Sequence, residues 1–244
     1  MRSLLWEPSS NKCRPAAYMS QPYPAPHMRS YSLLLPALFL LTITACKKDD
    51  DEAPVPTPPT PMDVSEFSQL EPGNYWVYER RQVDSMDVVQ GAGVSVDSVF
   101  VAGDTALNGQ TYTILRKATN GVLTNYRVYR RDSADCIVDD AHFIHFASNT
   151  FDQILESTYT GGPNGLQVDY SVSSTPVTMT TPAGTFNCYV VNGAMTSIGT
   201  FPVIAEWKSP RYYWAAGVGR VRWTDYFAFG DLGNRFELVR YSVQ

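Results

Sequence analysis

The stretch ALNGQTYTILRKATNGVLTNYRVYRR (106–131) decides the fold class of this chain of 244 residues. It holds two runs rich in aromatic and β-branched residues, TYTILRKA and VLTNYRVYRR, and each run follows an Asn-Gly pair. Asn-Gly tolerates positive φ at both positions and is a strong signal for a two-residue hairpin turn. Successive side chains of a strand point to opposite faces, so Tyr126, Val128 and Arg130 are expected to share one face. The stretch therefore predicts antiparallel strands joined by tight turns.

The same pattern continues outward from this stretch, beginning at Tyr75 and running to the end of the chain. About ten short strands separated by turn signals predict an all-β domain, a single antiparallel meander curved into a part-barrel or a sandwich. Helix signals are few. Asp63-Val64-Ser65-Glu66 has the form of a capping box and predicts a short helix over 63–70, and FDQILES (151–157) indicates one further turn of helix.

The apolar run LLLPALFLLTI (33–43) lies before the β domain and ends close to a cysteine. It has about half of the roughly 20 residues that a membrane-spanning helix needs, and its length suits the apolar region of a signal peptide. Arg29 supplies the positive charge that precedes such a region. A short hydrophobic helix with an incidental cysteine is the alternative interpretation.

The residues Ile43-Thr44-Ala45-Cys46 resemble the lipobox of bacterial lipoproteins. This resemblance implies that Cys46 is lipidated on its sulfur, that the chain is cut just before it, and that the protein is held at the bacterial outer membrane by its lipid. The acidic run KKDDDE (47–52) also resembles the tether that exports some lipoproteins to the cell surface, so the periplasmic and surface-exposed faces both stay open.

The chain is thus expected to have four parts. Residues 1–27 show no apolar periodicity, and we interpret them as a misplaced start, with translation beginning at Met28. The remaining parts are a lipoprotein signal peptide (28–45), a disordered acidic and Pro-rich tether (46–62) and the β domain (63–244).

Charge and cysteine content narrow the possible partners of the chain. From Cys46 onward, 15 Lys and Arg residues stand against 23 Asp and Glu residues, a formal net charge of −8. No basic run after the tether is longer than Arg130-Arg131, which argues against nucleic acid as a partner. Disulfides persist in the cell envelope, so Cys136 and Cys188 are either bridged or two separate buried thiols.

The segment DDAHFIHF (139–146) holds the only two histidines after the tether. Read as a strand, it places His142 and His145 on opposite faces, with Asp140 paired to His142 and Asp139 more loosely to His145. A metal pair or a histidine general base is conceivable, but no G-x-S-x-G motif supplies a nucleophile. We therefore predict no catalytic residue, no metal site and no cofactor.

Aromatic residues gather near the end of the chain, at Tyr212, Tyr213, Trp214 and Trp223. Such a cluster is able to line a sugar- or lipid-binding face, although aromatic residues more often fill the core of a β domain. Both interpretations stay open from sequence.

A second resemblance rests on LEPGNYWVYE (70–79), TPAGTFNCYVV (181–191) and YYWAAGVGRVRW (212–223), which are similar in order and kind to motifs of uncharacterised all-β envelope lipoproteins. Proteins of that family have no established activity, so the resemblance implies none for this chain. We therefore expect a membrane-anchored envelope lipoprotein that binds an unidentified protein, glycan or lipid without catalysing a reaction. The alternatives are an envelope hydrolase with scattered carboxylate and tyrosine residues, or a structural subunit of a surface assembly whose strand edges pair with neighbours.

Overall fold

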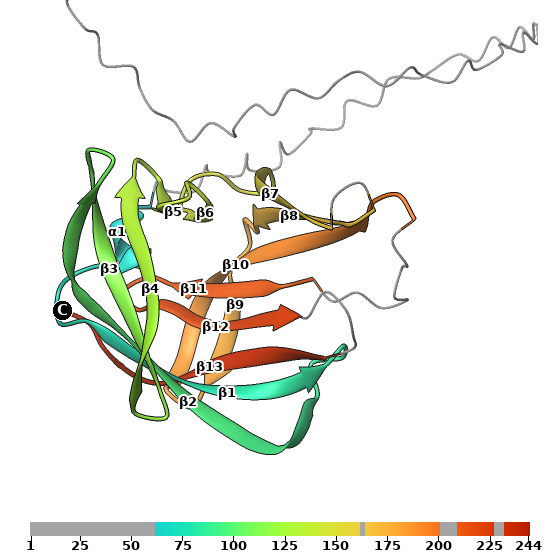
Figure 1. The fold of residues 1–244 in the computed structure, drawn as a ribbon, viewed down its shortest axis with the longest axis horizontal. Helices are drawn as coiled ribbons and strands as arrows, with labels where there is room; N and C mark the ends of the chain where they lie inside the picture. Colours follow the sequence, from blue (N-terminus) through green and yellow to red (C-terminus); the bar gives the residue numbers. More distant parts are fainter. Residues whose placement is uncertain (1–61, 162–163, 201–208, 227–231) are drawn as a thin grey trace, which may run out of the picture. The chain divides into compact units, whose positions relative to one another are not determined.

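The β domain is a single antiparallel sheet, seen in the computed structural model of Figure 1, which describes residues 62–161, 164–200, 209–226 and 232–244. The all-β class and the curved meander predicted from sequence are confirmed, with thirteen strands in these ranges rather than about ten. The elements are α1 (Ser65–Ser68), β1 (Tyr75–Asp84), β2 (Val89–Leu107), β3 (Gln110–Thr119), β4 (Val122–Ser133), β5 (Cys136–Asp139), β6 (Ile144–Ala147), β7 (Ile154–Thr160), β8 (Leu166–Val172), β9 (Val177–Thr181), β10 (Gly184–Ser197), β11 (Arg211–Ala215), β12 (Gly219–Tyr226) and β13 (Leu232–Ser242).

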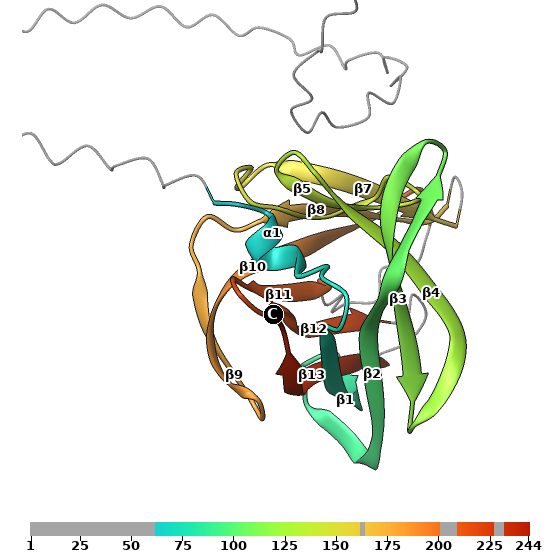
Figure 2. The same cartoon turned by 90° about the vertical axis from the view of Figure 1, so that its left-hand side faces the viewer.

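The strand order is β6-β5-β4-β3-β2-β1-β13-β12-β11-β10-β8-β7, with β9 paired to β10. The sheet curls so strongly that its two end strands, β6 and β7, come close to each other (Figures 1 and 2). Several of the strand pairings on this path shift register along their length, and bulges of this kind increase local twist and bend. The result is a nearly closed, barrel-like sheet with an inner and an outer face.

The two Asn-Gly turns lie where the sequence predicts them. Asn108 and Gly109 have φ of 51° and 76°, and Asn120 and Gly121 have φ of 49° and 80°. Positive φ at both central residues is what a type I′ hairpin turn requires. The side chain of Asn120 also accepts a hydrogen bond from the backbone N–H of Val96 at 2.9 Å, which attaches the β3–β4 turn to β2.

Helix α1 packs against the strands β4 and β12 at one end of the curled sheet. The Oδ1 atom of Asp63 accepts a hydrogen bond from the N–H of Ser65 at 2.9 Å, as a residue near a helix start does. Phe67 is 1% exposed, and its ring lies 4.6 Å from that of Phe146. The short helix expected over 63–70 is therefore present in a shorter form, and its aromatic residue covers this end of the sheet's interior.

Two residues of the motif LEPGNYWVYE (70–79) have structural roles here. The indole N–H of Trp76 in β1 donates to the carbonyl of Val218 in the β11–β12 turn at 2.6 Å. The fully buried Asn74 donates to the carbonyl of Gln69 and accepts from the N–H of Gln244, which joins the two ends of the sheet domain. These hydrogen bonds give Asn74 and Trp76 a role in holding the fold together.

Two local sequence predictions were wrong. The segment FDQILES is not helical, because Ile154–Thr160 form strand β7, paired with β8. The segment DDAHFIHF is not one strand but a hairpin, in which β5 ends at Asp139 and β6 begins at Ile144, with His142 in the turn at φ 66°. In the first case β-sheet pairing overrides a short helical pattern, as is usual for marginal segments.

The structure decides between a bridged and a free Cys188. Cys188 is a free thiol and is fully buried, so the bridge to Cys136 is not formed. The two residues also belong to different clusters of the core, with Cys136 beside Phe146 and Cys188 beside Leu238. The predicted signal peptide, the predicted tether up to residue 61 and the predicted lipidation site Cys46 lie outside the described residues.

Candidate ligand-binding site

The curled sheet encloses a cavity of about 430 Å³, which we call the lumen. Strands from nearly the whole circuit of the sheet line it, from β2 and β3 round to β8 and β10. Its apolar wall includes Val99, Leu115, Val128, Val191 and Phe236. The volume falls in the range of about 300–1,000 Å³ that is typical of small-molecule sites.

Strand β4 contributes Tyr126, Val128 and Arg130 to the lumen, the three residues that the alternation of the strand places on one face. Tyr126 is half exposed, whereas Arg130 is mostly buried and lies opposite Asp139 in the β4–β5 pair. Four residues of strand separate Tyr126 from Arg130, about 13 Å at 3.3 Å per residue. One face of β4 therefore runs from the opening of the lumen to its inner end.

Strand β12 contributes Arg220, Trp223 and Asp225 to the lumen. Regular alternation places residues three apart on opposite faces, yet Arg220 and Trp223 share a face here. The reason is a bulge, because Trp214 of β11 pairs with Arg220 while the preceding residue Tyr213 pairs with Arg222. The extra residue changes the phase of the strand.

The guanidinium groups of Arg130 and Arg220 lie over aromatic rings. Arg220 lies 3.8 Å from the ring centroid of Trp223, and Arg130 and Arg220 lie 5.8 and 5.9 Å from that of Trp214. These distances are within the roughly 6 Å of a cation–π contact. Among the residues that the structure describes, the Nε atom of each arginine has no hydrogen-bond partner, and no carboxylate lies within ion-pair distance of either guanidinium. Burial and the neighbouring Arg220 lower the pKa of Arg130 to about 10, so the Arg130 guanidinium remains charged at neutral pH.

The carboxylate of Asp139 is held by donors other than the arginines. Its Oδ1 accepts from the N–H groups of Ala141 and Phe143, at 3.0 and 2.9 Å, and its Oδ2 lies 3.0 Å from Nε2 of His145. Burial raises the pKa of Asp139, but these hydrogen bonds outweigh it and leave the pKa below its ordinary value. Burial and the nearby Arg130 lower the pKa of His145 to about 4, so the imidazole is neutral at pH 7.

The expected pairing of histidines and aspartates is therefore corrected. Asp139 binds His145 closely rather than loosely, because the hairpin turn brings the start of β6 back beside the end of β5. His142 is exposed in the turn, away from that pair. Within the described ranges, no group of three or more His, Cys, Asp or Glu side chains is placed to hold a metal ion.

Asp225 is exposed and lies at the rim of the lumen. Its two oxygens accept hydrogen bonds from the hydroxyl of Tyr212 at 3.0 Å and from the indole N–H of Trp223 at 3.1 Å. Burial and the adjacent Asp225 raise the pKa of Tyr212 well above its ordinary value, so the phenol stays protonated and donates. The Asp225 carboxylate is thus held by two aromatic side chains, and the ring of one of them, Trp223, is also covered by the Arg220 guanidinium.

A third carboxylate, Asp97, is 1% exposed and lies among cations. Its Oδ2 lies 3.7 Å from Nζ of Lys117 and 3.9 Å from Nε of Arg80, and its Oδ1 accepts from the hydroxyl of Thr119 at 2.6 Å. The charge of Asp97 is therefore balanced locally, and Asp97 does not neutralise the two arginines at the inner end.

The aromatic residues singled out from sequence divide between two faces. Tyr212, Trp214 and Trp223 line the lumen. Tyr213 faces the other way, where the guanidinium of Arg222 lies 5.9 Å from its ring centroid. Their contact with a ligand stays a prediction. Sequence reasoning missed Arg220 as a site residue because no local pattern reveals a bulge, whereas the alternation of β4 already placed Arg130 beside Val128.

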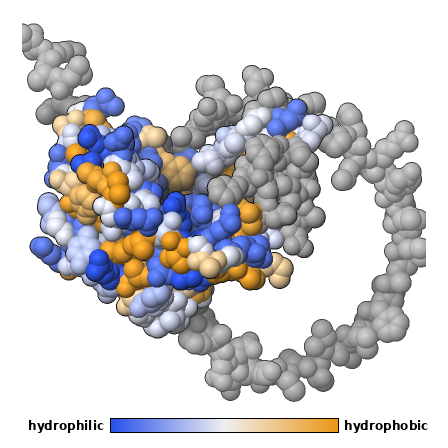
Figure 3. Space-filling view, turned by 60° about the horizontal axis from the view of Figure 1, so that its bottom comes forward, coloured by the Kyte–Doolittle hydropathy of each residue, from blue (hydrophilic) through white to orange (hydrophobic). Residues whose placement is uncertain are grey.

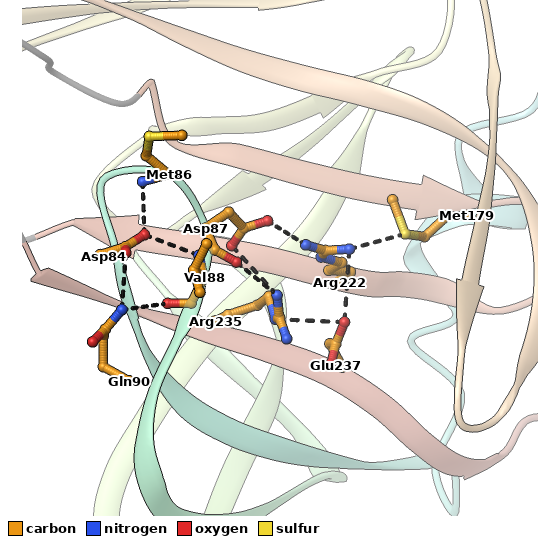
Figure 4. A network of polar contacts seen from close by, with 9 residues as sticks. All are labelled: Asp84, Met86, Asp87, Val88, Gln90, Met179, Arg222, Arg235 and Glu237. Atoms are coloured by element: carbon orange, nitrogen blue, oxygen red, sulfur yellow. Dashed lines mark hydrogen bonds and ion pairs between the residues drawn. The ribbon is translucent and has the colours of Figure 1, made fainter.

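On the opposite face of β12 and β13 two arginines are paired with carboxylates, as Figure 4 shows. Arg222 forms an ion pair with Asp87 and lies 3.6 Å from Glu237. Arg235 lies 3.5 Å from Glu237 and donates to the carbonyl of Asp87 at 3.1 Å. This network fastens the β1–β2 turn across β12 and β13. Arg222 and Arg235 can therefore be compared with the arginines that line the lumen.

The hairpins next to the half-exposed Tyr126 carry further apolar side chains. Val94 and Val96 in β2, and Val122 and Leu123 in β4, are exposed by 38% to 70%. In Figure 3, apolar and hydrophilic residues are interspersed over the face that comes forward. Among the described residues, no helix reaches the length and hydropathy that a membrane crossing requires.

No family model matches the chain, and no curated protein matches it. Three solved structures are similar. A candidate lipoprotein from Parabacteroides distasonis has a TM-score of 0.42 and 17% identity, over 72% of this chain and 98% of that one. A candidate exported protein with a YmcC-like fold from Bacteroides fragilis has a TM-score of 0.40 and 14% identity, over 70% and 96%. A β-barrel-like protein of a domain of unknown function from Brucella abortus has a TM-score of 0.28 and 10% identity, over 70% and 97%.

Proposed function

We propose that this chain is a lipid-anchored protein of the bacterial cell envelope whose lumen binds a small ligand without catalysing a reaction. The lumen carries the proposal, since it is a concave, largely apolar space with a few convergent polar groups, which is the usual form of a ligand site. The lipobox-like residues ending at Cys46 support the anchor and the envelope. The outer membrane is the location that this resemblance favours.

The polar groups of the lumen favour binding over catalysis. His145 is neutral and hydrogen-bonded to Asp139, with a pKa of about 4, so it is a weak base at neutral pH. The carboxylates of Asp139 and Asp225 are each occupied by two or more donors. A structural subunit that joins neighbours through sheet edges is less favoured, because the end strands β6 and β7 approach each other.

The binding function is tested by filling the lumen. Val128→Trp adds a large ring to the lumen wall, and Val122→Trp places the same ring at a site that is 70% exposed. Native mass spectrometry of the chain purified from envelope extracts is expected to show a bound small molecule in the wild type and in Val122→Trp, and none in Val128→Trp. The same bound mass in Val128→Trp would refute the lumen as the ligand site.

The anchor is tested by metabolic labelling with an alkyne-bearing fatty acid. Cys46→Ala is expected to abolish the label and to move the chain out of the membrane fraction, while Cys13→Ala leaves both unchanged. Full labelling of Cys46→Ala would show that the lipid is attached to another residue.

A further inference from the structure

Two cations converge at the inner end of the lumen, and neither has an ion-paired carboxylate among the described residues. Arg130 and Arg220 approach the same indole ring, that of Trp214, from strands β4 and β12. Trp214 is 2% exposed, and its own Nε1 atom has no hydrogen-bond partner in the described part of the chain. Buried cations and buried donors are normally paired, because an unpaired group loses its hydration without compensation. The inner end therefore offers several unused donors in one place.

Arg222 and Arg235, on the other face of β12 and β13, differ from the two lumen arginines in having carboxylate partners. Arg222 is two residues from Arg220, and it has carboxylate partners in Asp87 and Glu237. Some Nε atoms are unpaired on both faces, so Nε alone does not distinguish the two groups. The difference is the ion-paired carboxylate, which Arg222 and Arg235 have and Arg130 and Arg220 do not.

We propose that Arg130 and Arg220 together bind the oxyanion of a small amphiphile, a carboxylate or phosphate group carried on an apolar chain. The inference deepens the proposed function and rests on it. A guanidinium presents a planar fork of donors that matches carboxylate and phosphate geometry, which a single ammonium does not. The Arg220 guanidinium is held against the Trp223 ring, and both guanidinium groups lie within cation–π distance of Trp214, so part of the ordering is done before the ligand arrives.

The position of the pair sets the orientation of the ligand. Arg130 lies at the inner end of the face that begins at the half-exposed Tyr126, with Val128 between them. Phe67 and Phe146 pack at the same end as Trp214. The oxyanion therefore enters first, and the apolar chain extends along Val128 and Leu115 towards the opening, where the exposed apolar hairpins begin.

The carboxylates of the lumen do not prevent this binding. Asp139 is the cross-strand neighbour of Arg130, but its oxygens accept from His145 and from two backbone N–H groups. Asp225 stands at the rim and accepts from Tyr212 and Trp223. Each of these negative charges is stabilised by dipoles, which leaves the two guanidinium charges to the ligand.

The test uses isothermal titration of the full chain carrying Cys46→Ala, which removes the anchor's own acyl groups. The probes are laurate, dodecyl phosphate and dodecanol, all with a twelve-carbon chain and used below their aggregation concentrations. Laurate or dodecyl phosphate is expected to bind at least about tenfold more tightly than dodecanol, since a charge-assisted hydrogen bond supplies about that factor. The tighter of the two identifies the oxyanion.

Arg130→Gln and Arg220→Gln are each expected to weaken binding of the anionic probe about tenfold or more and to leave dodecanol unaffected. Arg127→Gln is the matched control, because Arg127 is an exposed residue of the same strand that faces away from the lumen. It is expected to stay within about twofold of the wild type, as isolated surface charges contribute little. Arg130→Met, which removes the buried charge and keeps an apolar stem, serves if a Gln variant does not fold.

Equal binding of dodecanol and the anions, unaffected by the Arg variants, would overturn the oxyanion inference and leave the lumen as a ligand site. Binding of none of the three probes would also overturn the inference, and the Val128→Trp comparison would then decide the proposed function separately. Loss of anion binding in Arg127→Gln to the same extent would assign the effect to net charge rather than to the lumen.

Discussion

Arginine residues on the two faces of one sheet have opposite electrostatic situations. Arg222 and Arg235 lie between Asp87 and Glu237, and their charges are neutralised within the fold. Arg130 and Arg220 lie against aromatic faces instead, and burial and mutual repulsion both disfavour the charge of Arg130. A protein selected only for stability would have apolar side chains in place of Arg130 and Arg220. The unpaired charges are therefore expected to reduce stability, as functional groups often do.

Replacing these arginines by methionine should change stability in opposite directions. Arg130→Met is expected to raise the free energy of unfolding by about 1–2 kcal/mol, because a buried cation with a lowered pKa is exchanged for an apolar side chain of similar length. Arg222→Met is expected to lower it by about 1 kcal/mol, since Asp87 and Glu237 each lose one of their two arginine partners and keep only Arg235. Urea unfolding in the absence of ligand measures both. A loss of stability in Arg130→Met would mean that its charge is neutralised after all.

His145 should make the fold sensitive to mild acid. An unfolded histidine has a pKa of about 6.5, whereas the folded pKa of His145 is about 4. Between these pH values the unfolded chain binds a proton that the folded chain does not, so stability falls as the pH drops from about 6.5 to about 4. The contribution reaches about 3 kcal/mol at most, at about 1.4 kcal/mol per unit of pKa.

Urea unfolding at pH 7 and at a pH of about 4.5 tests this effect. His145→Gln keeps a donor for Asp139 but does not titrate, so it should lose part of the acid sensitivity of the wild type. His142→Gln, at the exposed turn, should retain the wild-type difference. Identical pH dependence in all three proteins would contradict the assignment to His145.

At the scale of single elements, the turns were predictable and the bulges were not. Asn-Gly pairs specify positive φ at two consecutive residues, and this local chemistry located both hairpins of β2–β4. The β4 alternation also placed Arg130 on the face of Val128. The bulge in β12 has no such local signature, because it arises from the pairing with β11, whose register shifts between Tyr213 and Trp214. Arg220 therefore entered the candidate site only through the structure.

Segments FDQILES and DDAHFIHF were misassigned for a related reason. Each is short, and its secondary structure depends on which strand pairs with it. Ile154–Thr160 pair with β8, and the end of DDAHFIHF pairs with residues 136–138, which precede the segment. Pairing of that kind is a tertiary property that a window of seven or eight residues does not contain.

The β3–β4 turn gives a test at this scale. Gly121 has φ 80°, and no atom lies within 4 Å of the position that an added Cβ would take, so Gly121→Ala should destabilise the fold by about 1 kcal/mol through backbone strain alone. Gly93 has an equally open surrounding and no positive φ. Gly93→Ala should be neutral or slightly stabilising, because it restricts the unfolded chain. Equal effects of the two substitutions in thermal unfolding would rule out backbone strain as the cause.

At the scale of the whole molecule, Cys188 lies inside one of the hydrophobic clusters of the core. Its thiol is fully buried next to Leu238 and Val221, and burial raises its pKa to about 12. The thiolate is the reactive form, so native Cys188 should resist alkylation. Iodoacetamide labelling of the peptide that holds Cys188, followed by mass spectrometry over increasing urea, should follow the global unfolding curve.

Labelling of Cys188 well before the global transition would show that β10 opens separately from the rest of the sheet. A peptide from the same protein without cysteine is the natural reference for recovery. The comparison uses the wild-type chain, so no substitution disturbs the core.

The pairing of β1 with β13 places the first and last strands side by side in the interior of the strand order rather than at its edges. A ribosome delivers β1 long before β13. Hairpins β1–β2–β3–β4 can pair as they emerge, but the half of the sheet that carries Arg220 joins them only when residues 232–244 have been made. The lumen is consequently assembled last, and until then β1 and β12 are both open edges that a chaperone or another copy of the chain could occupy.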